Sequence, residues 1–443
     1  MRAEVLTIGD ELLRGEIVDS NKSFLSDRLL GLDIETWFHS SVRDEPDDMR
    51  DAFLRAIDRA EVVLVSGGLG PTRDDLTTEV LAETVGRKLV LDENALEALR
   101  TFFANVGREM AKNNEKQAWF PEGADVLENP IGTAPGFMIE ERGTLVFCMP
   151  GVPRELFKMM DEQVLPRIAR KLGGGGEQGA GLVVRATLLR TFGMGESTLD
   201  AELSDIAKDG DVTLGFRTAF PDNYLRPLAR AATAEEADAK LGEVCDAIRE
   251  RLGALVYGEN DDTLEVVVGR ELTKQGKTLA TAESCTGGLI AEQLTDVPGS
   301  SEYFCGGVVA YANEAKTALL GVDEAMLAEH GAVSEPVALA MARGACERFG
   351  ADLGISTTGI SGPGGGSDKK PVGLVYIALH RADGPAHCER FVFPLDRGRH
   401  RQLTAHTALD WVRRSLLGVE LVGPSLMRRQ GGASTPGGGA QRG

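Results

Sequence analysis

Ser284, in a turn that contains two glycines, is a residue whose setting could support covalent chemistry. The run Glu283-Ser284-Cys285-Thr286-Gly287-Gly288 follows an apolar stretch that starts near residue 277 and precedes apolar residues at helical spacing. The pattern predicts a buried strand, a turn and a helix. Such a junction exposes a nucleophile and points backbone N–H groups at an anion. Ser284 is therefore a candidate nucleophile, and a helix N-cap formed by Ser284 or Thr286 is the structural alternative.

A serine hydroxyl needs a base to take its proton. The five histidines after residue 262 lie outside the polar motifs, whereas a second apolar run, residues 306–310, is followed by Tyr311, Asn313 and Lys316. Burial or a neighbouring cation can lower the pKa of a lysine towards neutrality. We therefore expect a Ser284–Lys316 dyad. Cys285 is the rival nucleophile, although the neighbouring carboxylate of Glu283 disfavours a thiolate.

Two further segments extend this pattern. Residues 357–366 form a glycine-rich loop, Thr-Thr-Gly-Ile-Ser-Gly-Pro-Gly-Gly-Gly, and an Asp-Arg-x-x-x-Arg run starts at Asp396. Together with the serine and lysine motifs, they resemble the C-terminal domain of the CinA (competence/damage-inducible) family from about residue 264 to residue 416. Leu395 stands where that family more usually has glycine. Enzymatic members of the family are nicotinamide mononucleotide deamidases.

The resemblance implies hydrolysis of nicotinamide mononucleotide to nicotinate mononucleotide and ammonia, without a cofactor, in pyridine nucleotide salvage. Ser284, Lys316 and Tyr311 would be the catalytic group, with Tyr311 orienting Lys316 or relaying its proton. Either Arg397 or Arg401 would pair with the phosphate, and the choice between them stays open. The remaining expected substrate-binding residues are Glu283 for the ribose or the pyridinium, Thr286, Gly287 and Gly288 as N–H donors, and Thr358, Gly359, Ser361, Gly362 and Gly364 around the ribose phosphate.

Polar loops also follow two apolar runs near the N-terminus. Residues 3–8 and 61–66 predict buried strands, and the loops after them begin at Gly9-Asp10-Glu11 and at Gly67-Gly68-Leu69-Gly70. Alternating strands and helices predict an open α/β sheet, in which ligands bind at the carboxyl ends of the strands. Glycine N–H groups can hold a phosphate while Asp74 and Asp75 hold a divalent metal. A turn followed by an aspartate N-cap is the structural alternative.

This part of the chain, about residues 1–170, resembles the MoaB/MogA-like, molybdopterin-binding domain that begins CinA proteins. Molybdopterin binders usually have threonine where this chain has Leu69, which agrees with the CinA branch, some members of which hydrolyse ADP-ribose with a divalent metal. The resemblance therefore implies an ADP-ribose pyrophosphatase, a degenerate form of one, or a nucleotide sensor. The expected nucleotide-binding residues are Gly67, Gly68, Gly70 and Lys116, and the expected ligands of Mg²⁺ or a similar ion are Asp10, Asp74 and Asp75.

The chain divides into three predicted α/β domains and a tail. A MoaB/MogA-like domain spans residues 1–172, a glycine-rich connector follows, and a small α+β, KH-like module spans residues 182–258. We expect this middle module to be a spacer or an assembly element. The deamidase-like domain spans residues 262–420. Residues 423–443, rich in Gly, Ser, Pro and Arg, are expected to be disordered.

Composition narrows the class of protein further. The net charge is −20, and an acidic surface repels a phosphate polymer, so we expect small nucleotides rather than nucleic acid as partners. We expect no membrane partner, because no run of about 20 apolar residues occurs. The six cysteines have no paired spacing, which favours a reducing cytoplasm.

Relatives of both outer domains self-associate, so a homodimer is implied. A non-catalytic pterin- or nucleotide-binding regulator linked to competence is the alternative function, and an assembly protein for competence or recombination is a third.

Overall fold

The computed structural model describes residues 1–32, 34–171, 183–207 and 210–425. Its contacts divide the chain into two compact units. The first contains residues 1–185 and 230–238, and the second contains residues 186–229 and 239–443. The predicted glycine-rich connector and most of the predicted disordered tail lie outside the described residues. Each unit is described by itself below.

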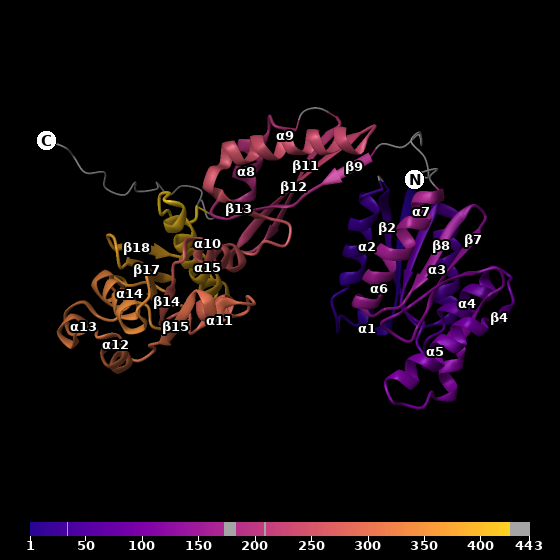
Figure 1. Cartoon of the computed structure of the whole chain (residues 1–443), viewed down its shortest axis with the longest axis horizontal. Coiled ribbons are helices and arrows are strands. Elements are labelled where there is room, and N and C mark those ends of the chain that lie inside the picture. Colours follow the sequence, from indigo (N-terminus) through magenta and orange to yellow (C-terminus); the bar gives the residue numbers. More distant parts are fainter. Residues whose placement is uncertain (33, 172–182, 208–209, 426–443) are drawn as a thin grey trace. The chain divides into compact units, whose positions relative to one another are not determined.

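The N-terminal domain is an α/β domain built on one sheet with the strand order β2-β1-β3-β8-β7-β6 (Figure 1). The pairs β1–β2, β1–β3 and β3–β8 are parallel, whereas β7 pairs antiparallel with both β8 and β6. A small second sheet joins β4 and β5. The elements are β1 (Arg2–Ile8), α1 (Asp10–Leu13), α2 (Ser20–Leu30), β2 (Glu35–Val42), α3 (Pro46–Arg59), β3 (Val62–Ser66), α4 (Thr77–Thr84), β4 (Leu89–Leu91), α5 (Glu93–Asn105), a 3-10 helix (Lys112–Ala118), β5 (Trp119–Pro121), β6 (Asp125–Leu127), β7 (Gly136–Glu141), β8 (Thr144–Met149), α6 (Pro153–Met159), a π-helical turn (Met160–Val164) and α7 (Leu165–Lys171).

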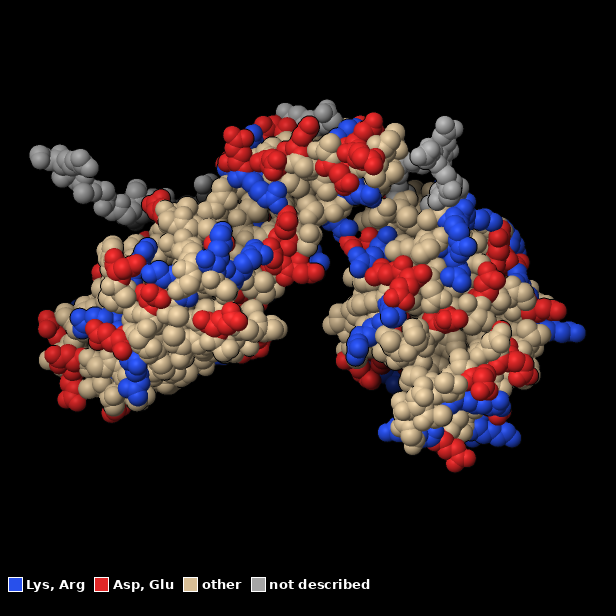
Figure 2. Space-filling model, viewed as in Figure 1, with Lys and Arg blue, Asp and Glu red and all other residues tan. Residues whose placement is uncertain are grey.

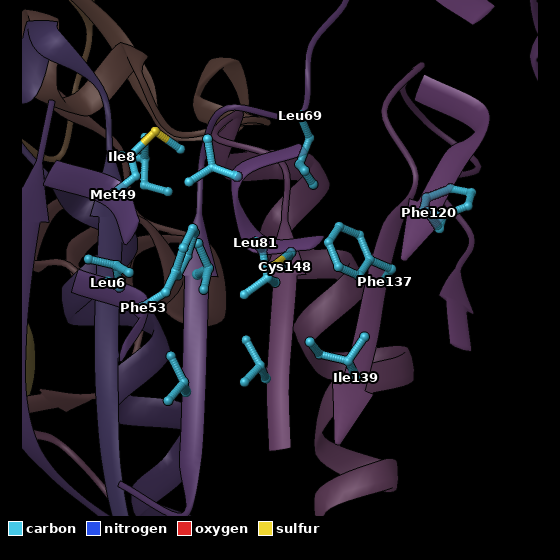
Figure 3. Packing of buried hydrophobic residues seen from close by; sticks show 14 of the residues in the cluster. Leu6, Ile8, Met49, Phe53, Leu69, Leu81, Phe120, Phe137, Ile139 and Cys148 are labelled. Atoms are coloured by element: carbon cyan, nitrogen blue, oxygen red, sulfur yellow. The ribbon is translucent and has the colours of Figure 1, made fainter. Parts of the chain in front are cut away.

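Alternation along the central strands creates two cores, one on each face of this sheet. Leu6, Val63 and Cys148 pack with α3, α4 and α5 on one face, which Figure 3 shows around Phe53 and Phe137. Val5, Leu64 and Phe147 pack with α2, α6 and α7 on the other. The parallel strands β1 and β3 therefore end together in the polar loops after Ile8 and Ser66, as the sequence predicted for a ligand site.

The middle module consists of β9 (Val183–Ala186), β10 (Leu189–Thr191), α8 (Glu196–Leu203), β11 (Val212–Ala219), β12 (Asp222–Ala231), α9 (Ala234–Leu252), a 3-10 turn (Gly253–Leu255) and β13 (Val256–Glu259). Its antiparallel sheet has the order β11-β12-β10-β13. The predicted long helix at residues 234–252 is observed with those bounds. This helix–sheet arrangement is the expected α+β fold.

The C-terminal domain has a five-stranded sheet in the order β15-β14-β16-β17-β18. Strands β15, β14 and β16 run parallel, and β17 and β18 complete the sheet with antiparallel pairs. The domain comprises α10 (Leu264–Gln275), β14 (Leu279–Glu283), α11 (Leu289–Thr295), a 3-10 turn (Ser300–Glu302), β15 (Phe304–Val309), α12 (Asn313–Leu320), α13 (Glu324–His330), α14 (Glu335–Phe349), β16 (Leu353–Gly359), β17 (Leu374–Arg381), β18 (His387–Val392) and α15 (Arg397–Leu417).

Helices cover both faces of this sheet. Leu279 and Ile355 pack with α10, α11 and α15 on one face, and Ala280 and Ala282 pack with α12 and α14 on the other. Because β14, β15 and β16 are parallel, the Ser284 turn, the Tyr311 loop and the glycine-rich loop emerge from the same edge of the sheet. This edge gathers the three segments that the sequence singled out.

The surface mixes charges of both signs. On the face that Figure 2 shows, Lys and Arg are interspersed with Asp and Glu rather than gathered into one broad basic area. No helix in the described parts of the chain combines the length and hydropathy needed to cross a bilayer.

Candidate functional site

The Ser284 hydroxyl and the Lys316 amine meet, although 32 positions separate them in the chain. Ser284 lies directly after the last residue of β14, and Lys316 lies on the inward face of α12, whose first residue is Asn313. Lys316 Nζ donates to Ser284 Oγ at 3.2 Å and to the Ala310 carbonyl at 2.8 Å. Both side chains are buried. The geometry suits proton transfer from the hydroxyl to an uncharged amine.

The surroundings of Lys316 favour that uncharged form. Its side chain is 1 % exposed, and burial lowers its pKa from the ordinary 10.5, because the charged form loses its hydration. Its contacts are a hydroxyl and backbone carbonyls, including that of Tyr311 at 3.4 Å. Carbonyls satisfy the N–H groups and leave the nitrogen lone pair for the serine proton.

Cys285 occupies the opposite environment. Its thiol is buried, and that burial raises its pKa to about 12. A thiol with this pKa is almost fully protonated near neutral pH and is a poor nucleophile. Cys285 instead packs in the core shared by Ile290 and Leu294, so the structure favours Ser284 of the two candidates.

Tyr311 lies close to Lys316 in the chain, but its phenol does not contact the amine. The ring is 61 % exposed, and its hydroxyl accepts a hydrogen bond at 3.0 Å from Arg397 Nη2. Arg397 Nη1 donates at 3.0 Å to the carbonyl of Gly362 in the glycine-rich loop. The prediction that Tyr311 orients Lys316 or relays its proton is therefore corrected for the side chain: the Tyr311 carbonyl contacts the amine, while the hydroxyl binds Arg397, which also binds the glycine-rich loop.

Glu283 also has a different place from the one predicted. Its carboxylate is 1 % exposed and accepts backbone N–H bonds from Gly288, Ile290 and Ala291 at 2.9–3.1 Å. A carboxylate that accepts three N–H groups at a helix start is satisfied there and does not face a ribose or a pyridinium ring. The same contact occupies the Gly288 N–H, which leaves Thr286 and Gly287 as the predicted N–H donors of the turn. Gly288 itself has φ 96°, a backbone conformation that favours glycine.

The Ser284 turn is also held by Thr357 and Arg401, both of which contact Thr286. Thr286 Oγ1 lies 2.7 Å from Thr357 Oγ1, and Arg401 donates through Nε and Nη2 to the Thr286 carbonyl at 3.0 and 2.7 Å. Thr358 does not face the turn, because its buried hydroxyl donates to the Ala332 carbonyl at 2.7 Å. Thr357, which the sequence reasoning did not single out, takes its place. It lies on β16 two residues after the apolar Ile355 and aligns with Glu283 in the parallel register, a position that strand pairing could have indicated.

The glycine-rich loop lies beside Arg397, and its predicted role around a ribose phosphate stays a prediction. Gly362 accepts from Arg397, Gly359 ends β16, and Gly364 is exposed. The Ser361 hydroxyl is buried, and within the described residues it has no hydrogen-bond partner. Buried hydroxyls are normally satisfied, so an unpaired one next to this loop is a group that a ligand oxygen could complete.

A second candidate site lies in the N-terminal domain, at the carboxyl ends of β1 and β3. A cavity of about 480 Å³ is lined there by Gly67, Gly68 and Gly70 together with Asp74 and Asp75. Gly67 has φ 107°, and a Cβ on it would lie 2.3 Å from the Ile8 carbonyl oxygen, so glycine is required where the two loops touch. Further carboxylates line the same cavity, namely Glu11, Asp19, Asp44 and Glu155, and the lining contains no Lys or Arg.

Asp10 and Lys116, two residues predicted for this site, already have partners within the protein. The Asp10 carboxylate pairs with Arg14 and with Arg43, and hydrogen bonding from Arg43 is the main cause that lowers its pKa. Lys116 Nζ donates at 2.7 Å to the carbonyls of both Thr72 and Asp75, so it braces the loop.

The predicted metal ligands Asp10, Asp74 and Asp75 do not converge. In the described parts of the chain no three His, Cys, Asp or Glu side chains gather as a metal site, and Asp75 accepts from the Thr72 N–H at 2.8 Å. The sequence reasoning missed Asp44 as a residue of this cavity. Burial raises the pKa of its carboxyl group, and the nearby charges of Glu11, Asp10 and Asp74 raise it further. Asp44 follows the polar–apolar alternation of β2, which could have placed it at the same edge as Asp74.

Comparisons with known proteins agree with this architecture. Residues 261–416 match the CinA C-terminal domain, residues 186–258 match the damage-inducible protein CinA KH domain, and residues 4–170 match the family described as "Probable molybdopterin binding domain". A CinA-like protein of Geobacter sulfurreducens is 43% identical over 418 residues, covering 94% of this chain and 100% of that one. The CinA-like protein of Dictyoglomus thermophilum is 41% identical over 420 residues, with 95% and 100% covered.

A solved structure, that of the competence/damage inducible protein CihA from Agrobacterium tumefaciens, is 42% identical, with a TM-score of 0.34, and covers 35% of this chain and 93% of its own. The two CinA-like relatives extend over almost the whole chain, and the three family matches follow one another in the order of the three domains. This chain, with its MoaB/MogA-like, KH-like and C-terminal α/β domains, belongs to the CinA family.

Proposed function

We propose that the C-terminal domain hydrolyses the carboxamide of nicotinamide mononucleotide. The observation that carries the proposal is the 3.2 Å contact between Ser284 Oγ and a buried Lys316 amine. Few structural roles require a lysine to give up its hydration, and a lowered lysine pKa beside a serine is the arrangement that general-base catalysis needs.

The reaction follows in two balanced halves. Lys316 takes the proton of Ser284 as Oγ bonds to the carboxamide carbon, and the oxyanion forms facing the turn N–H groups. Collapse of this intermediate breaks the C–N bond, and the proton on Lys316 leaves with the nitrogen as ammonia. Water then loses a proton to Lys316 and attacks the acyl ester. The carboxylate product departs, and the proton returns to Ser284.

Other parts of the site fit the remainder of the substrate. Arg397 and Arg401 place two cations beside the glycine-rich loop and the Ser284 turn. Arg401 is half-buried, and Arg397 is exposed. A guanidinium can exchange a carbonyl partner for a phosphate, which is the stronger acceptor. The Tyr311 hydroxyl accepts from Arg397, and its exposed ring offers an aromatic face to a flat ring.

Ammonia release from nicotinamide mononucleotide tests the proposal. Wild-type protein should release ammonia, and Ser284→Ala and Lys316→Met should each lower kcat by at least about 10²-fold, the range of a lost nucleophile or base. The exposed residues Ser301 and Lys274 provide matched controls, since Ser301→Ala and Lys274→Met alter the same residue types on the same domain. Unchanged turnover in Ser284→Ala would refute the mechanism.

A second candidate function belongs to the acidic cavity. We propose that this cavity binds a nucleotide such as ADP-ribose together with a divalent cation. The lining has carboxylates and glycine N–H groups but no Lys or Arg, so an anionic phosphate needs a cation for compensation. Mg²⁺ is commonly held by one or two carboxylates and substrate phosphates, and Asp44 and Asp74 are the pair that would hold it. Bound there, the ion would polarise the pyrophosphate.

Release of AMP from ADP-ribose, with and without a chelator, tests this second function. Asp74→Asn should abolish metal-dependent turnover, whereas Asp58→Asn, a change on the exposed surface of the same domain, should not. If nucleotide binding by calorimetry is unaffected by both the chelator and Asp74→Asn, the cation has no part in the site.

A further inference from the structure

Part of the middle module packs into the core of the C-terminal domain, although the module also has a core of its own around Leu189, Leu225 and Ile248. Phe192 after β10 and Tyr257 on β13 are buried in the same apolar cluster as Leu264, Leu403 and Trp411. The partly buried ring of Phe220 packs against that cluster as well. Because these aromatic side chains are buried in the core of the C-terminal domain, residues 186–229 and 239–258 are a structural part of the C-terminal unit.

A buried polar cluster specifies how this joint closes. Asp222, the first residue of β12, is 7 % exposed and accepts from the Tyr257 hydroxyl at 2.6 Å. Its other carboxylate oxygen lies 2.7 Å from Nε2 of His406 on α15, and the Phe192 ring lies edge-on to His406 at 4.6 Å. The Asp222–His406 approach is within ion-pair distance but lacks hydrogen-bond geometry, so the Tyr257 hydrogen bond and this close approach together fix where the module meets α15.

Further along α15, Arg413 is a second buried polar residue that contacts the middle module. It is 2 % exposed, pairs with Asp410, and donates from Nη2 to the Ala254 carbonyl at 2.6 Å. Near the start of α15, Arg399 lies over the Phe220 ring at 5.5 Å. Arg399, His406 and Arg413 follow a seven-residue spacing, which places them on one stripe of the helix.

The opposite stripe of α15 carries the arginines of the candidate active site. Arg397 and Arg401 lie roughly half a turn around the helix from that stripe, at 3.6 residues per turn. They contact the Gly362 carbonyl, the Tyr311 hydroxyl and the Thr286 carbonyl. The helix is therefore held between the middle module on one face and the loops of the site on the other.

We infer that Asp222 of the middle module is a positioning residue for the reaction at Ser284, acting through His406 and α15 on Arg397 and Arg401. The inference rests on the proposed deamidase function and adds a role for a module outside the catalytic domain. Asp222 contacts no reacting group. The proposed effect of Asp222 is to fix the positions of the Arg397 and Arg401 guanidinium groups.

Substrates with and without a phosphate provide the decisive measurement. Asp222→Asn keeps the shape of the side chain and removes its charge, and the milder Tyr257→Phe removes only the hydroxyl that binds it. Couplings of this kind change affinity by about 2- to 30-fold. We expect KM for nicotinamide mononucleotide to rise within that range in both variants, and KM for nicotinamide riboside, which lacks the phosphate, to stay unchanged. Asp261→Asn, at an exposed position beside the module, should match wild type for both.

Hydrogen exchange supplies a readout that does not depend on turnover. The backbone amides of residues 397–402 should exchange faster in Asp222→Asn and Tyr257→Phe than in wild type or Asp261→Asn. Equal loss on both substrates, or a lower unfolding midpoint with unchanged KM and unchanged exchange, would overturn the inference in favour of a purely structural joint. If wild type releases no ammonia, the proposed function fails, and exchange at residues 397–402 alone decides whether Asp222 positions the helix.

Discussion

Burial of the Lys316 amine costs folding free energy, and the proposed reaction would give that burial a role. The amine is buried against carbonyls and a hydroxyl, so the charged form lacks the carboxylate partner that a structural lysine would have. Ser284 and Lys316 could be proposed from the sequence because each ends or follows an apolar strand. Their pairing as a dyad could be proposed as well, but its geometry could not, since the 3.2 Å contact depends on the register that brings β14 beside β15.

The rate should rise with pH through the lowered pKa of Lys316. Burial places this pKa below the ordinary 10.5, and only the uncharged amine accepts the serine proton. As pH increases, the uncharged fraction grows, so kcat/KM for nicotinamide mononucleotide should climb and level off once the amine is deprotonated. A pH–rate profile of wild type checks this. Lys316→Arg keeps a cation that does not deprotonate and should be inactive across the range, and activity in that variant would argue against the lysine as base.

Replacement of Cys285 should leave the reaction intact. Its pKa is raised to about 12 by burial, so a thiolate contributes little near neutral pH. Cys285→Ala should retain kcat within about threefold and lose about 1–2 kcal/mol of stability from the smaller side chain. Initial rates and a urea unfolding curve measure the two effects. A loss as large as that of Ser284→Ala would identify the thiol as the nucleophile instead.

At the scale of elements, Glu283 ties the Ser284 turn to the start of α11. The carboxylate accepts three backbone N–H groups, and an amide at this position offers one acceptor oxygen and presents an NH₂ group to the remaining donors. Glu283→Gln should therefore cost about 2 kcal/mol. Trp411 fluorescence during urea unfolding, in a Trp37→Phe, Trp119→Phe background, reports this domain. Glu292→Gln, on the exposed side of the same helix, should be neutral, and equal behaviour of the two variants would contradict the capping role.

The first turn of α15 should contribute affinity for the phosphate. Arg397 is exposed and divides its guanidinium between Tyr311 and Gly362, whereas Arg401 is half-buried and gives both bonds to Thr286. We expect Arg397→Ala to raise KM for the nucleotide by about 10- to 150-fold, which corresponds to the 1.5–3 kcal/mol of a charged hydrogen bond. Arg401→Ala should mainly lower kcat, because it releases the turn beside Ser284. Steady-state kinetics with each variant distinguish the two roles, and the reverse pattern would exchange the assignments.

Elements with strong periodicity could be predicted from the sequence, and elements made by tertiary pairing could not. The continuous apolar runs of β1 and β3 and the long amphipathic α9 carry their own signals. The three-residue strands β4, β5 and β6 have too few residues for a period, and they form only because a neighbouring strand pairs with them. The predicted metal-ligand set of Asp10, Asp74 and Asp75 failed for a similar reason, because side-chain partners depend on tertiary contacts. The loop sequence placed Asp10 at the right edge of the sheet, but its carboxylate pairs with Arg14 and Arg43, and the three aspartates do not converge.

At the scale of the whole molecule, charge discriminates between the proposed enzyme and a protein that acts on DNA. The chain carries −20, and many of its described arginines and lysines pair with carboxylates at the surface, as Arg28 does with Asp161 and Arg251 with Asp205. Binding to a duplex depends on cations that displace counterions from phosphates. An acidic surface with internally paired cations offers few of these.

The full chain should therefore show no measurable binding to duplex DNA. Fluorescence anisotropy with a labelled duplex should remain flat at 50 mM salt, where electrostatic binding is strongest, and at 200 mM salt. The same preparation should release ammonia from nicotinamide mononucleotide, so that a flat binding curve cannot arise from unfolded protein. Lys274→Glu, which adds negative charge away from the site, should change neither result. Binding at 50 mM that weakens steeply towards 200 mM would show that a local cluster of cations outweighs the net charge, and would favour a role on DNA over small-nucleotide chemistry alone.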